Sequence, residues 1–74
     1  MIQVGAKYRH FKNPEHIYKV IAIARHSETL EPMVVYQALY DDGFIKKGDI
    51  WVRPATMWED DKGGIPRFAL VSDK

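Results

Sequence analysis

Three of the arginines, two histidines and a glutamate are the side chains of this 74-residue chain that are best suited to recognition chemistry. An arginine guanidinium is a planar fork that matches the two oxygens of a carboxylate or a phosphate, and a glutamate can pair with it. An internal network of ion pairs that fixes the loops would use the same residue types, so both interpretations stay open. The six candidate binding residues are Arg9, His10, Arg25, His26, Glu28 and Arg53.

The triplet His26-Ser27-Glu28 contains residue types that serve as base and nucleophile in hydrolases. Adjacent residues of an extended chain point to opposite faces, so His26 is poorly placed to activate Ser27. The chain has no cysteine that could act as a nucleophile instead. Hydrolytic catalysis is therefore not expected, and a small catalyst or metabolite sensor that uses His26 and Glu28 is kept as an alternative.

A metal site could use His10, His26 and Glu28, because His26 and Glu28 are alternate residues that share a face of an extended chain. No two histidines have the close spacing that is typical of zinc motifs. The sequence therefore predicts no metal site and no cofactor.

The segment Tyr8-Arg9-His10-Phe11-Lys12 interleaves aromatic and basic residues, and Trp51 and Arg53 lie two residues apart in another predicted strand. Small barrels bind single-stranded nucleic acid through stacked aromatic rings and a basic groove. The net charge of the chain is only +1, far below the basic excess of most such proteins. Binding of single-stranded nucleic acid is therefore a second alternative.

The composition is that of an ordinary globular domain, with 46% hydrophobic and 28% charged residues. The longest apolar run, residues 20–24, is far shorter than the ~20 residues that span a bilayer. The absence of cysteine excludes disulfides and thiolate metal sites, and it makes the reducing cytoplasm the expected compartment. Residues 1–26 carry five basic residues and one acidic residue, so an uneven surface charge is expected to steer anionic partners.

The elements that must position these side chains are short β-strands. Runs of β-branched and aromatic residues alternate with Gly, Pro, Asn and Asp, which is typical of strands and turns. Residues 17–25 are apolar on both faces, which predicts a central strand that is covered on both sides. Five strands are predicted, at residues 7–12, 17–25, 33–40, 50–53 and 66–71, with a short helical or 3₁₀ segment at 54–59.

These elements predict one domain over residues 1–74 that belongs to the all-β class. The expected architecture is a small five-stranded SH3-like barrel with one short helical turn before the last strand, because closure removes exposed sheet edges. A small β-sandwich or an OB-like barrel is the alternative. The expected core contains Tyr36 and either Trp51 or Val52, together with Ile21, Ile23, Val35, Leu39, Phe68 and Leu70.

Four separated motifs also occur here in order: Tyr8-Arg9-His10-Phe11-Lys12, Ala24-Arg25-His26-Ser27-Glu28-Thr29, Val34-Val35-Tyr36-Gln37-Ala38-Leu39-Tyr40 and Trp51-Val52-Arg53-Pro54. In these motifs the chain resembles a family of short bacterial proteins that is catalogued only as a domain of unknown function and whose members resemble SH3-type barrels. Asn13-Pro14 stands where a glycine turn is expected, and the hairpin at residues 41–49 is longer than usual. The resemblance implies a fold and no activity.

A small barrel with scattered Arg, His and aromatic residues and no competent nucleophile is typical of a binding module. The expected function is therefore non-enzymatic binding of a peptide, another protein or a small anion. The partner itself and the oligomeric state are not specified by the sequence.

Overall fold

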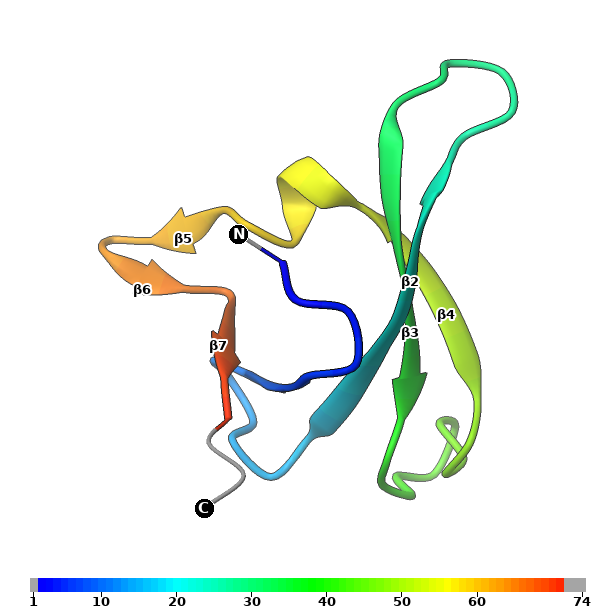
Figure 1. Cartoon of the computed structure of the whole chain (residues 1–74). Helices are drawn as coiled ribbons and strands as arrows, with labels where there is room; N and C mark the ends of the chain where they lie inside the picture. The colour runs from blue at the N-terminus through cyan, green and yellow to red at the C-terminus, as the bar shows by residue number, and fades with distance from the viewer. Residues whose placement is uncertain (1, 72–74) are drawn as a thin grey trace.

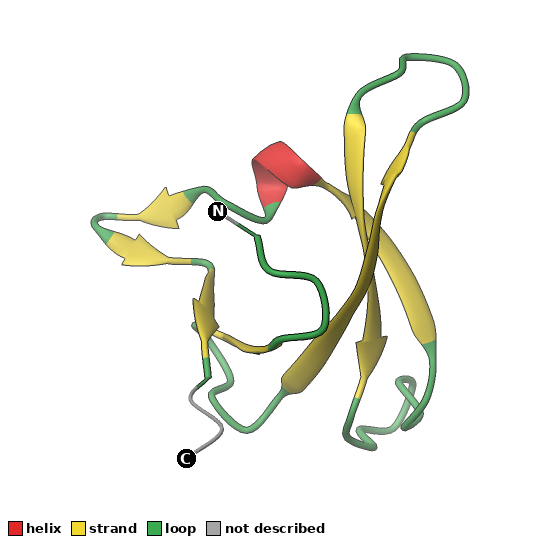
Figure 2. Cartoon of the chain, in the orientation of Figure 1, coloured by secondary structure: helices red, strands yellow, loops and turns green. Residues whose placement is uncertain are grey.

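The computed structural model describes residues 2–71, and almost all of its regular structure is β-strand (Figures 1 and 2). A five-stranded sheet has the order β4-β3-β2-β1-β7, and each neighbouring pair is antiparallel. The sheet is open, with β4 and β7 at its two edges. Its strands are β1 (Lys7–His10), β2 (Ile17–Arg25), β3 (Pro32–Ala38), β4 (Ile50–Pro54) and β7 (Phe68–Leu70).

A short connection links β4 to β7 (Figure 1). It consists of the 3₁₀ turn η1 (Ala55–Met57) and a two-stranded hairpin of β5 (Asp61–Lys62) and β6 (Ile65–Pro66). No helix within residues 2–71 has the length and hydropathy needed to cross a membrane.

The longest strand, β2, contains a β-bulge. Val20 pairs with Tyr36 of β3, but the next pair is Ala22 with Val35, so Ile21 is an extra residue on β2. A bulge bends its strand and increases the local twist. The sheet accordingly curls, and the hairpin formed by the far ends of β2 and β3 projects away from the rest of the chain (Figure 1).

The core lies on the inner face of the curled sheet and is largely aromatic. Tyr8 of β1 pairs with Tyr18 of β2, so the two rings lie on one face of the sheet. Trp58, which follows η1, stacks on Phe68 with ring centres 3.8 Å apart, so the connection closes over the open side of the core. The buried side chains are Tyr8, Tyr18, Val20, Val34, Tyr36, Ala38, Trp58 and Phe68.

The all-β prediction and the positions of the main strands are confirmed. The predicted bounds of β2 match those of the structure, whereas the first, third and last strands are shorter than or shifted from the predicted ranges. The helical segment is reduced to residues 55–57, and the β5–β6 hairpin was not predicted. The terminal residues 1 and 72–74 of the predicted domain lie outside the described residues.

The predicted core is correct for Tyr36 and Phe68, and Trp51 packs against it. Val35 and Leu39 are only partly buried. The prediction is wrong for four side chains that are exposed, namely Ile21, Ile23, Val52 and Leu70.

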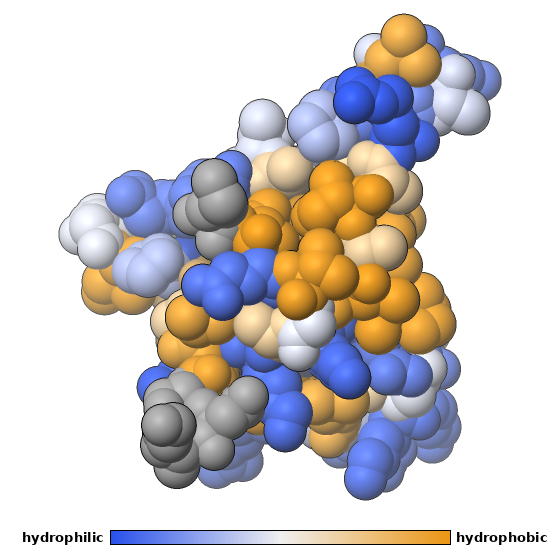
Figure 3. All heavy atoms as spheres, in the orientation of Figure 1, coloured by the Kyte–Doolittle hydropathy of each residue, from blue (hydrophilic) through white to orange (hydrophobic). Residues whose placement is uncertain are grey.

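The prediction that β2 is covered on both sides is also wrong. A single layer of strands curls around the core, so the outer face of β2 has no covering layer. Figure 3 shows apolar residues gathered at the surface over the region of β2, β3 and β4.

Candidate functional site

A small pocket of about 170 Å³ lies against the core side of β2, β3 and β4. Its walls are Tyr18, Tyr36, Ile45, Trp51 and Arg53. Trp51 pairs with Tyr36 and Arg53 pairs with the buried Val34, so both β4 side chains lie on the inner face of the sheet. The expectation that Trp51 and Arg53 share one face of a strand is therefore confirmed.

Arg53 is the only charged residue among those that line this pocket. Its guanidinium carbon lies 5.2 Å from the centre of the Phe68 ring, which is a favourable cation–π position. Within residues 2–71, no carboxylate lies within ion-pair distance of Arg53. The half-buried guanidinium is therefore available to an anion.

Trp51 contributes the face of an aromatic ring to the pocket wall. Its indole Nε1–H is buried and has no hydrogen-bond partner among the described residues, which costs about 1–3 kcal/mol. Phe44, which is 86% exposed, lies 6.3 Å from the Trp51 ring and extends the aromatic surface outward.

The hydroxyl of Tyr18, in the pocket wall, is neutral. Tyr18 hydrogen-bonds to the hydroxyl of Tyr40, and Arg53 is close enough to act on Tyr18 electrostatically. Burial first, and then the bond to Tyr40, raise the pKa of Tyr18 well above its usual range. Tyr40 in turn stacks on His16, whose Nε2 lies 3.2 Å from Asp42 Oδ2.

His10 joins Arg53 beside Phe68. The His10 ring meets the Phe68 ring edge to face, with centres 5.2 Å apart. Burial lowers the pKa of His10, and the positive charges of Arg53, Arg67 and Lys12 lower it further. Arg67 is already paired with Asp60 at 2.7 and 3.0 Å, so Arg53 is the cation beside Phe68 that remains for an anionic ligand.

Replacing Arg53 with Met should raise the pKa of His10 toward its usual value of 6.5, because the largest electrostatic cause of the shift is removed. An NMR pH titration of the His10 ring measures this change. Arg25→Met, in the projecting hairpin, is the control and should leave the His10 titration unchanged. An unchanged His10 titration in Arg53→Met would contradict the proximity of the two groups.

The same shift affects stability with a defined sign. A histidine whose folded-state pKa is lowered contributes its full stability above pH 6.5, and that stability is lost as the pH falls through the folded-state pKa. In Arg53→Met, the loss of folding stability that His10 causes at acid pH should therefore be smaller.

Three of the predicted site residues lie in the projecting hairpin, away from Arg53 (Figure 1). His26 Nδ1 accepts hydrogen bonds from the backbone N–H groups of Glu28 and Thr29, at 3.1 and 3.3 Å. Arg25 donates to the carbonyl of Leu30 at 2.8 Å, and Leu30 has a positive φ of 66° that strains a non-glycine residue. These bonds hold the turn, so the side chains of Arg25 and His26 have a local structural role.

Arg9 lies on the outer face of the sheet. It pairs with Ile17 of β2 and Ala69 of β7, and its neighbour Tyr8 is the residue that faces the core. Of the six predicted site residues, the structure therefore brings only His10 and Arg53 together.

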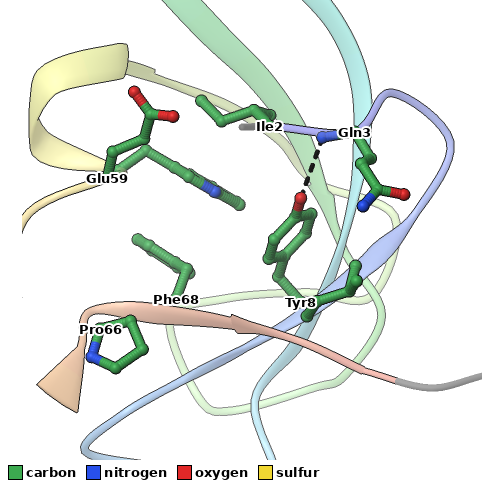
Figure 4. A pocket seen from close by; sticks show the side chains of 8 residues that line it. Ile2, Gln3, Tyr8, Glu59, Pro66 and Phe68 are labelled. Carbon is green, nitrogen blue, oxygen red and sulfur yellow. Dashed lines mark hydrogen bonds between the residues drawn. The ribbon is translucent and has the colours of Figure 1, made fainter.

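A larger pocket of about 270 Å³ is lined by Phe68 and residues of the N-terminal segment and was not predicted (Figure 4). Tyr8 and Phe68 line its floor, and the Tyr8 hydroxyl accepts a hydrogen bond from the backbone N–H of Gln3 at 2.9 Å. Its lining includes the carboxylate of Glu59 and, among the described side chains, no arginine, lysine or histidine. The smaller pocket is therefore the better candidate for charge-dependent recognition.

Within residues 2–71, no three His, Cys, Asp or Glu side chains come close enough to hold a metal ion.

Comparisons with known proteins agree with the fold. The family described as Protein of unknown function (DUF1653) matches residues 6–70. A crystal structure of a DUF1653 protein from Bordetella bronchiseptica is similar, with a TM-score of 0.73 and 33% sequence identity over 96% of this chain and 88% of that chain. No curated protein shows significant similarity to the chain.

Proposed function

This chain belongs to the DUF1653 family of proteins of unknown function, and we propose that it is a non-enzymatic binding module for an anionic group. The ligand group is a carboxylate or a phosphate attached to an apolar body. The observation that carries this proposal is a pocket in which the half-buried Arg53 has no carboxylate partner among the described residues and lies beside the ring of Trp51.

The volume of the pocket limits the size of the bound group. Pockets that hold a whole drug-sized molecule or cofactor are about 300–1,000 Å³. A pocket of about 170 Å³ instead suits one side chain, a chain terminus or a small acid. The exposed Phe44 and the ring of Trp51 would contact the apolar part of such a ligand beside the charged group.

The positions of the other polar groups support binding over the two alternatives. His26 and Glu28 lie in a hairpin turn whose hydrogen bonds already use His26 Nδ1, and neither lines either of the two pockets described above. Tyr8 is buried in the core, which removes one of the aromatic rings on which a nucleic-acid base could stack.

The binding module would use an SH3-like framework in the cytoplasm. Five antiparallel strands that curl around one core, with a 3₁₀ turn between β4 and β7, support the SH3-like part of this proposal, although the sheet is not closed into a barrel. The absence of cysteine supports a reducing compartment.

Titration with benzoate tests the proposal, because benzoate combines a carboxylate with an apolar ring. We expect NMR shifts at the Trp51 indole N–H and at the backbone amides of Ile45 and Arg53, with a dissociation constant on the order of millimolar. Benzamide, which has the same shape without the charge, should give much smaller shifts. Phenyl phosphate replaces the carboxylate and tells which anion is preferred. Equal shifts with benzoate and benzamide, or shifts elsewhere only, would contradict the proposal.

A further inference from the structure

The strand that carries Arg53 is also an edge of the sheet. β4 pairs with β3 on one side and has no neighbouring strand on the other within residues 2–71. An edge strand presents unpaired backbone N–H and C=O groups that can template a further strand.

The register of β3 and β4 identifies these groups. The N–H of Ala38 donates to the carbonyl of Asp49 at 2.9 Å, and antiparallel ladders alternate hydrogen-bonded and non-hydrogen-bonded pairs. The pairs of Tyr36 with Trp51 and of Val34 with Arg53 are therefore the hydrogen-bonded ones. Ile50 and Val52 consequently direct their N–H and C=O groups outward, away from β3.

Few of the usual protective features are present on β4. Natural edge strands are commonly shortened or carry lysines and prolines that block pairing. β4 has five residues, and its only proline, Pro54, is its last residue. Ile50 and Val52 are 57% and 56% exposed. The other edge strand, β7, has only three residues and follows soon after Pro66.

We propose that an extended acidic peptide adds to β4 as a further antiparallel strand. Its central residue would exchange two hydrogen bonds with Val52 across the edge. Its neighbour opposite Arg53 would then lie on the inner face, so an acidic side chain at that position meets the guanidinium. The residue opposite Trp51 lies two positions later in the peptide and would be apolar, which predicts the pattern acidic–any–apolar.

The positive charge of Arg53 beside β4 favours an acidic peptide as the added strand. Arg53 has no carboxylate partner among the described residues, whereas Arg67 is paired with Asp60. A peptide with an acidic residue supplies the missing carboxylate, and its backbone supplies the missing hydrogen bonds of the edge. The inference rests on the proposed function, because it uses the same anion pocket.

Backbone methylation of a test peptide separates strand addition from simple charge pairing. The probe is the blocked peptide acetyl-Thr-Glu-Ser-Leu-Thr-amide, in which Glu faces Arg53, Ser faces Val52 and Leu faces Trp51. N-methylation of the Ser removes a hydrogen bond to β4, whereas N-methylation of the Leu alters a group that points away from β4. Calorimetry should show that methylation at Ser weakens binding about tenfold or more and that methylation at Leu changes it by less than about threefold. Replacing the Glu with Gln should weaken binding about tenfold.

The outcomes distinguish this inference from the proposed function. If benzoate still shifts the pocket residues but the two methylated peptides bind alike, strand addition is wrong and the anion pocket stands. If neither benzoate nor the peptide binds, both proposals fail. If the protein forms a dimer in solution that the peptide does not dissociate, the proposed addition of a peptide strand is also wrong, because a second copy of the chain would then occupy β4. Tighter binding of a single-stranded oligonucleotide than of the peptide would overturn it as well.

Discussion

Trp58→Ala should leave the domain largely unfolded at physiological temperature. Trp58 is only 2% exposed, stacks on Phe68 and meets the rings of Tyr8 and Tyr36 edge to face. Truncation of a buried Trp typically costs about 3–5 kcal/mol. At ~0.05–0.15 kcal/mol per residue, a domain of this size has roughly 4–11 kcal/mol of stability in total.

The neighbouring Met57 supplies a matched control. Met57 is the last residue of the 3₁₀ turn and directly precedes Trp58, but its side chain is 48% exposed. Met57→Ala should change the free energy of unfolding by about 0.5 kcal/mol or less. Urea melts followed by circular dichroism compare the two variants with the parent chain. Equal midpoints for Trp58→Ala and Met57→Ala would show that the connection does not close over the core as described.

Arg53→Met should weaken benzoate binding by about tenfold or more. A hydrogen bond to a charged group contributes about 1.5–3 kcal/mol, and about 1.4 kcal/mol corresponds to a factor of ten. Methionine keeps an apolar stem of similar length, so contact with the Phe68 ring is retained while the charge is lost. NMR titration of both proteins with benzoate measures the change.

Arg9→Met is the control for this variant, because it makes the same change in net charge on the outer face of the sheet. It should leave benzoate affinity within about twofold of the parent, since a fully screened surface charge contributes little. A similar loss in both variants would mean that net charge, and not the pocket, controls binding. Thermal melts of both proteins confirm that any loss does not arise from unfolding.

The sequence predicted the position of β2 but not the faces of its second half. Alternation along residues 17–25 assigns Ile21 and Ile23 to one face. The bulge at Ile21 adds one residue, so the pairing beyond it is displaced and Ile23 lies opposite the buried Val34. Ile23 is nevertheless exposed, because this part of β2 runs toward the projecting hairpin. An apolar run on both faces carries no signal of a bulge.

Other parts of the core and fold were missed because their elements are too short for a repeating pattern of apolar residues to appear in the sequence. Trp58 lies in a segment predicted as one helical turn, and a single turn gives no repeat that distinguishes an inward side chain. The β5–β6 hairpin has two residues in each strand, so no alternation exists there.

The candidate site was only partly predictable for a topological reason. Arg53 and Trp51 could be paired because alternate residues of one strand share a face. His10 comes from β1, which is separated from β4 in the sheet by β2 and β3. Only the curl of the sheet and the position of Phe68 bring the two side chains to one ring. The spacing of His10 and Arg53 along the chain contains no information on that curl.

The two tryptophans of the chain lie in different environments, which gives each a separate use in spectroscopy. Indole fluorescence changes in wavelength and intensity when water or a charged group approaches the ring. Trp58 is enclosed by other aromatic rings in the core, so its emission reports the loss of the native fold. Trp51 lines the small pocket, so its emission reports what enters beside Arg53. Without any added label, the domain thus carries one optical reporter of folding and another of ligand occupancy.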